Sequence, residues 1–131
     1  MSVVRAAASP SELFHAIETN RPLLVESLLS NPALSVNWVN PQYLKITSLH
    51  LACMKRYRNI VQLLLKHPLI DPNVKSGNGD TPFLTVCRLG TLDIVEELLK
   101  CPKVDVNVSS QDLAQTGLLL AVRGNFIELV R

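Results

Sequence analysis

The sequence predicts an all-α solenoid in which small units, each made of two helices, stack in a row. A short phrase that begins at Thr47 returns at Thr81 and again at Thr116, at steps of 34 and 35 residues. A sequence period in this range is typical of stacked supersecondary units rather than of a single globule. Each unit also carries two apolar runs at helical spacing, which predicts helix pairs packed on their neighbours.

The repeat extends beyond this phrase, because other landmarks lie at fixed distances from the threonine. A valine follows it by 14 residues in each copy, and paired leucines follow that valine wherever the copy is complete. An earlier copy begins at Ser11 and keeps the same order of landmarks. We therefore predict a single domain, 1–131, with repeats at about 9–40, 41–75 and 76–109 and an incomplete fourth repeat at 110–131.

The first helix carries a clear start signal in the stretch Ser9-Pro10-Ser11-Glu12. Serine is a favoured capping residue, proline suits the first helical position, and a glutamate three residues after the cap can return a hydrogen bond to it. The sequence therefore predicts a helix that begins at Pro10.

The second repeat shows both helices of a unit. Leu49, Ala52 and Cys53 share one helical face, and a second apolar face begins at Ile60. The second helix is expected to stop near His67, because the following proline restricts that residue and offers no backbone donor.

Two kinds of turn separate these helices. Between repeats, the stretch 73–80 holds Gly77 and Gly79, which permit the positive φ of tight turns. Between the two helices of a repeat, Gly90 has Asn20, Arg56 and Asn125 at the equivalent positions. Asparagine tolerates a left-handed backbone, whereas Arg56 in that conformation would store about 1 kcal/mol of strain.

Several of these stretches together resemble the ankyrin repeat, over about 11–131. The resemblance rests on the phrases that begin at Thr47 and Thr81, on the Val-x-x-Leu-Leu runs and on the closing Asp-x-Asn. It implies antiparallel helix pairs, β-hairpin-like fingers between repeats, and a concave face made of fingers and first helices. It also implies a non-catalytic module that binds other proteins.

Departures from the family pattern point to a candidate contact. The motif histidine is kept only as His50. The stretch from Asn37 to Thr47 is two residues longer than the one from Asn73 to Thr81. Because insertions in repeat proteins collect in loops on one face, often the binding face, the long first finger is a candidate binding element.

Composition excludes several classes of protein. The chain has 13 Lys and Arg against 11 Asp and Glu, a net charge of +2, which is far from the strong basicity of a nucleic-acid binder. No apolar run approaches the roughly 20 residues of a membrane span, and 1–8 lacks the pattern of a secretory signal. Three cysteines suit a reducing compartment, so we expect an intracellular, cytoplasmic protein.

The cysteines and histidines do not predict a catalytic or metal site. Cys53 and Cys87 are 34 residues apart, which is one repeat, and stacked helices lie about 10 Å apart, whereas Zn–S bonds need about 2.3 Å. We expect both thiols to pack in the core and His50 to be a structural hydrogen-bonding residue. The glycines at 77 and 79 are not followed by the Lys-Ser/Thr of a phosphate loop. The prediction is therefore no enzyme, no cofactor, no metal and no small-molecule substrate.

Two further groups each allow two interpretations. The basic stretch Lys55, Arg56 and Arg58, with Tyr57 inside it, is either a solvated turn or a patch that binds an acidic peptide, less readily a phosphate backbone. Trp38 follows the end of the first unit and either covers the core edge or contacts a partner. The same alternatives apply to Tyr43, since both aromatic types often carry binding energy.

These observations predict a scaffold or adaptor module that binds a partner protein, with an acidic segment of that partner as the candidate ligand. One alternative is a substrate-recruiting part of a larger enzyme or secreted effector, and a second is a binder of acidic lipid or nucleic acid through the basic turn. The sequence leaves the oligomeric state open. The expected partner-binding residues are Trp38, Tyr43, Lys45, Met54, Lys55, Tyr57, Lys75, Asn78, Asp80, Arg88, Asp112, Gln115 and Arg123.

Overall fold

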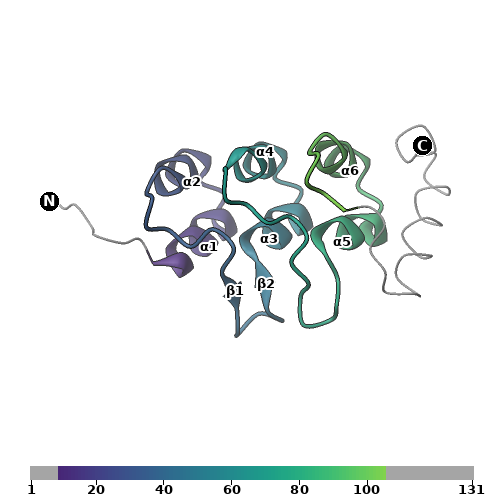
Figure 1. Cartoon of the computed structure of the whole chain (residues 1–131), viewed down its shortest axis with the longest axis horizontal. Coiled ribbons are helices and arrows are strands. Elements are labelled where there is room, and N and C mark those ends of the chain that lie inside the picture. Colours follow the sequence, from purple (N-terminus) through teal and green to yellow (C-terminus); the bar gives the residue numbers. More distant parts are fainter. Residues whose placement is uncertain (1–8, 106–131) are drawn as a thin grey trace, which may run out of the picture.

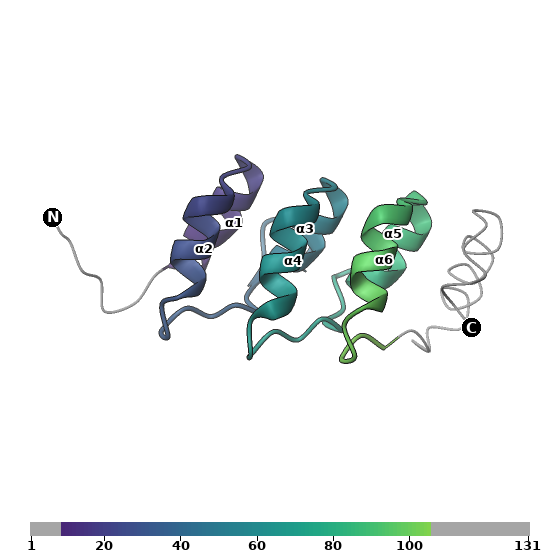
Figure 2. The same cartoon turned by 90° about the horizontal axis from the view of Figure 1, so that it is seen from above.

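The computed structural model of the chain describes residues 9–105, and its helices form two layers (Figure 1). One layer holds the first helix of each repeat: α1 (Pro10–Glu18), α3 (Ser48–Met54) and α5 (Pro82–Leu89). The other, which we call the outer layer, holds the second helices: α2 (Pro22–Leu29), α4 (Arg58–Lys66) and α6 (Leu92–Leu99). Figure 2 shows the pairs side by side in a row, which confirms the predicted solenoid. The predicted fourth repeat lies outside the described residues.

The helix ends follow the sequence signals. The Ser9 backbone N–H donates to Glu12 Oε1 at 3.0 Å, as a capping glutamate should. Thr81 accepts the backbone N–H of Leu84 at 3.3 Å and so caps α5. α4 ends at Lys66, and His67 is already extended, with φ −67° and ψ 131°, before Pro68.

The turns inside the repeats have the predicted left-handed residues. φ is 54° at Asn20, 59° at Arg56 and 69° at Gly90. One residue in this conformation reverses the chain direction between the two helices, so that the second helix can pack back on the first. Arg56 therefore does adopt the unfavourable conformation.

A continuous core lies between the two layers. Val25, Val61 and Val95, the recurring valines of the repeat, are all fully buried in it. Cys53 and Cys87 are buried between the helices, as predicted. Burial raises the pKa of the Cys87 thiol to about 11 and raises that of Cys53 further, so both remain protonated thiols at neutral pH.

The first finger is the hairpin of β1 (Val39–Asn40) and β2 (Ile46–Thr47), which projects beyond the layer of first helices (Figure 1). The strands are antiparallel, with Val39 opposite Thr47. Both Leu44 and Lys45, next to β2, have φ of 56°. Two successive left-handed residues that are neither glycine nor asparagine were not predicted from the sequence.

Asparagine side chains join each repeat to the next. Asn37 donates to the Leu69 carbonyl and accepts the Asp71 N–H, each at 2.8 Å. Asn73 makes the same pair of bonds one repeat later, to the Lys103 carbonyl and the Asp105 N–H, again at 2.8 Å. The recurring asparagine therefore holds adjacent loops in register.

Candidate partner-binding surface

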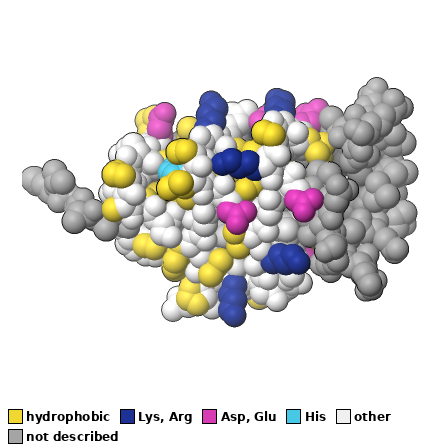
Figure 3. Space-filling view, in the orientation of Figure 1, with side chains coloured by type: hydrophobic (Ala, Val, Ile, Leu, Met, Phe, Trp, Pro, Cys, Tyr) yellow, Lys and Arg dark blue, Asp and Glu magenta, His cyan; other side chains and the backbone are white. Residues whose placement is uncertain are grey.

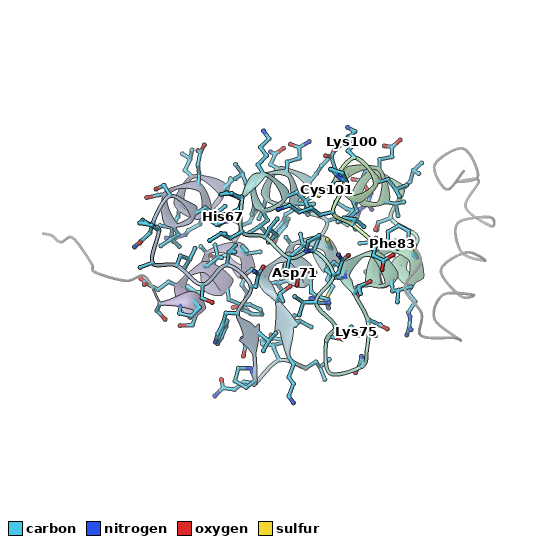
Figure 4. The ribbon with its side chains drawn as sticks, in the orientation of Figure 1. His67, Asp71, Lys75, Phe83, Lys100 and Cys101 are labelled. Atoms are coloured by element: carbon cyan, nitrogen blue, oxygen red, sulfur yellow. The ribbon has the colours of Figure 1, made fainter. Side chains whose placement is uncertain are left out.

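Seven of the predicted binding residues are exposed and lie on the fingers or near the ends of first helices. We call this set the finger-helix face: Tyr43, Lys45, Met54, Lys55, Lys75, Asn78 and Arg88. Figure 3 shows hydrophobic and basic side chains together at the lower edge of the molecule, where the fingers project. The second finger is the loop 73–80 between α4 and α5. In Figure 4, Lys75 lies on this finger, far from Lys100 and Cys101, which follow α6.

Aromatic contacts attach the first finger to α1. The Tyr43 ring lies 5.6 Å from the Phe14 ring, and its hydroxyl donates to Glu18 Oε2 at 3.4 Å. Trp38 meets Phe14 edge-on, with ring centroids 6.3 Å apart. Trp38 is half-buried and packs on the core, which favours its interpretation as a cover for the core edge.

A backbone hydrogen bond joins the two fingers. The Gly77 N–H donates to the Leu44 carbonyl at 2.7 Å. A Cβ added at Gly77 would lie 3.0 Å from that carbonyl oxygen, so the close approach depends on glycine. The finger tips are therefore positioned against each other rather than independent.

Asp80 is not solvent-facing, contrary to the prediction. It is only 6% exposed, and its carboxylate accepts a 3.1 Å hydrogen bond from Arg88. Its backbone carbonyl accepts the Nε2–H of the fully buried His50 at 2.8 Å. Asp80 thus fixes Arg88 and the second finger, and the Arg88 guanidinium is the exposed member of the pair.

The basic turn is largely paired within the protein. Arg56 contacts Asp93 at 3.4 Å, and Arg58 donates to Glu97 at 2.7 Å. Tyr57 is half-buried and packs on the core. These pairs favour the structural interpretation of the turn over an anion-binding patch. Sequence reasoning missed them, although Asp93 and Glu97 lie just over one period after the arginines and so fall on the adjacent repeat.

Glu97 is the buried carboxylate of this pair, with 5% of its surface exposed. Burial alone would raise its pKa, but hydrogen bonds from Arg58 and Gln62 and the charge of Lys100 outweigh burial and lower the pKa. Glu97 is therefore ionised at neutral pH and holds α6 to the first residue of α4.

A groove of about 410 Å³ lies on the outer helix layer, away from the fingers, and was not predicted. It is lined by Gln62, Leu65, Lys66, Glu97, Lys100, Cys101 and Pro102.

Further sites were sought among residues 9–105. In that range no group of three or more His, Cys, Asp or Glu side chains is placed to hold a metal ion. None of the helices described there has the length and apolar character needed to span a membrane. The predicted contacts Asp112, Gln115 and Arg123 lie outside the described residues.

Comparison with known proteins adds a family and a fold. A family model described as ankyrin repeats, in three copies, matches residues 13–110. Among solved structures, the chain is similar to the crystal structure of EF0377, an ankyrin repeat protein, with a TM-score of 0.70 and 18% sequence identity. The match covers 90% of this chain and 63% of that chain, so this chain spans less than two thirds of that protein's length. Such low identity carries the fold alone. No curated protein matches this chain.

Proposed function

Because this chain belongs to the ankyrin-repeat family, we propose that it is a non-catalytic module that holds a partner protein on the finger-helix face. Ankyrin repeats are generally protein–protein interaction modules. The proposal for this chain adds the face and the chemistry of the partner. We also propose a cytoplasmic location, which the free thiols of Cys53, Cys87 and Cys101 support.

The distribution of charge on the finger-helix face carries the proposal. Lys45, Lys55 and Lys75 are exposed there, together with Arg88. The Asp80 carboxylate, which opposes Arg88, is buried. The face thus presents cations without exposed carboxylates among its seven residues, which suits an acidic segment of a partner.

The fixed positions of the residues on the finger-helix face are a second reason to propose it as the binding surface. The fingers are tied to each other through Leu44 and Gly77, and the first finger is tied to α1 through Tyr43. Because these elements are ordered before a partner arrives, little conformational entropy has to be lost on association.

The basic turn is a weaker candidate for an acidic lipid or nucleic acid, since Arg56 and Arg58 already contact carboxylates. Binding to anionic vesicles or to generic DNA that falls steeply with salt would favour that alternative. A substrate-recruiting role in a larger enzyme or effector would use the same finger-helix face, and the identity of the captured partner would distinguish the two.

The proposal is tested by affinity capture from a cell lysate with wild type and the Lys55→Glu variant, followed by titration of the purified partner. Lys55→Glu is expected to weaken binding because it reverses a charge on the face. Lys66→Glu is the matched control, since Lys66 is equally a surface lysine but belongs to α4 in the outer layer. Equal recovery of every partner by wild type and Lys55→Glu would contradict the proposal.

A further inference from the structure

The tip of the first finger exposes an apolar side chain in an unfavourable backbone conformation. Leu44 is 63% exposed and has φ of 56°, and the next residue, Lys45, has the same φ. Glycine and asparagine adopt this conformation readily, whereas residues such as leucine do so at an energetic cost. Neither the local backbone nor the core explains a leucine at this position.

The Leu44 backbone is held in place by its own hydrogen bond and by those of its neighbours. Its carbonyl accepts the Gly77 N–H at 2.7 Å, and the Lys45 N–H donates to the Asn40 carbonyl at 3.0 Å. The preceding residue, Tyr43, is fixed on α1 by Phe14. The tip is therefore a projection with a fixed backbone, and tyrosine, the neighbour of Leu44, is a residue type that often carries binding energy.

Two lysines flank this apolar tip. Lys45 follows Leu44 directly, and Lys75 lies two residues before Gly77, whose N–H contacts the Leu44 carbonyl. Both lysines are exposed. The patch thus has Tyr43 and Leu44 at its centre and positive charge at its edge, so its complement is a segment with apolar side chains and carboxylates.

We propose that Leu44 is the anchor of the partner site, and that it is covered by an apolar side chain of an extended acidic segment whose carboxylates pair with Lys45 and Lys75. This assignment rests on the proposed function. It names the chemistry of the partner at the tip of the first finger, where Leu44 lies between Tyr43 and Lys45 of the finger-helix face. Leu44 is then retained for binding at the expense of folding stability. A substitution that removes the Leu44 side chain but suits the left-handed backbone should therefore keep or raise folding stability and lower binding affinity.

The substitution that separates the two responses is Leu44→Asn. Asparagine relieves the left-handed conformation but removes the apolar anchor. We expect the thermal midpoint to stay unchanged or to rise, and binding to fall about 10-fold or more, as expected for the loss of a well-buried leucine contact. Leu69→Asn is the matched control, because Leu69 is also an exposed loop leucine, at 67%, but lies after α4 in the outer layer.

The probe is a displayed library of random peptides selected on the wild-type chain, with individual peptides then titrated against each variant. The proposal expects selected peptides to combine Asp or Glu with apolar residues, to bind Leu69→Asn like wild type, and to lose affinity for Leu44→Asn and Lys75→Glu. It is overturned if no peptide is selected, if the peptides lack this composition, or if Leu44→Asn lowers the thermal midpoint together with binding.

The Lys55→Glu variant, measured with the same peptides, separates this proposal from the function it rests on. Peptides that lose affinity for Lys55→Glu but bind Leu44→Asn as tightly as wild type would support the finger-helix face as the binding surface and refute Leu44 as its anchor. Peptides that depend on neither residue would overturn both.

Discussion

Replacement of His50 tests how the second repeat is held to the third. His50 is fully buried, and its Nδ1 accepts the Thr47 backbone N–H at 3.1 Å. Nε2 must therefore carry the proton that it donates to the Asp80 carbonyl at 2.8 Å. Leucine, which occupies the equivalent position as Leu84, would remove the partner of the Thr47 N–H and leave the Asp80 carbonyl with the Ser76 N–H alone. An unsatisfied buried group costs about 1–3 kcal/mol, so we expect His50→Leu to lose about 1–3 kcal/mol.

The pH dependence of stability gives an independent measure of the same residue. Burial lowers the pKa of His50 below its ordinary value of 6.5, against the opposing effect of the hydrogen bond to Asp80. The unfolded chain therefore takes up a proton at a higher pH than the folded one. Stability is complete above about pH 6.5 and decreases as the pH falls from there toward the folded pKa, by at most about 1.4 kcal/mol per pH unit.

Thermal and urea denaturation between neutral and mildly acidic pH measure both effects. His50→Leu should lower the midpoint by about 4–12 °C, since each kcal/mol corresponds to about 4 °C for a chain of 131 residues. His50→Gln should be intermediate, because an amide can still donate a hydrogen bond but does not titrate. A His50→Leu midpoint within about 2 °C of wild type, or an unchanged pH dependence near 6 in both variants, would refute the reasoning.

Four further substitutions or conditions have defined outcomes. Leu64→Ala should lose about 2–5 kcal/mol because it opens a cavity in the core, and a urea melt equal to wild type would contradict this. Asn73→Ala should lose about 1–3 kcal/mol, for two inter-repeat hydrogen bonds, and should speed hydrogen exchange at the Asp105 amide. Gly77→Ala should lose about 1–3 kcal/mol in urea melts, since the new Cβ meets the Leu44 carbonyl. Acid titration should show a second loss of stability below the ordinary Glu97 pKa of 4.5, because the folded pKa is lowered; Glu97→Leu should remove that loss.

The repeat pattern predicted the architecture because the same physical requirements recur in every copy. A threonine cap, a small residue between helices and a valine in the core are each local signals, so the helices and the left-handed turns at Asn20 and Arg56 could be located from the sequence. Most of the predicted site residues were placed by the same pattern, whereas Trp38 and Tyr57 were proposed as aromatic side chains. The structure exposes most of the predicted residues that it describes.

Residues that depend on two repeats at once were not predictable from one copy of the pattern. Asp80 follows Gly79 in a turn and is polar, which favours exposure, yet Arg88 and the His50 contact hold it inside. Arg58 looked like part of a basic patch because its carboxylate, Glu97, belongs to the next repeat. The left-handed Leu44 carries no sequence signal, since leucine rarely adopts that conformation.

The contacts between repeats also explain why the binding proposals concentrate on the fingers. The first repeat meets the second through aromatic packing of Phe14 with Tyr43, whereas the second meets the third through Arg58 with Glu97 and through the two finger backbones. Arg58 and Glu97 are paired with each other between repeats, so their charges largely neutralise each other and attract a ligand only weakly. The finger lysines have no such role among the described contacts, and Leu44 is exposed at a cost to the backbone. Selection for a partner can therefore act on the finger lysines without loss of stability, whereas at Leu44 it acts against stability.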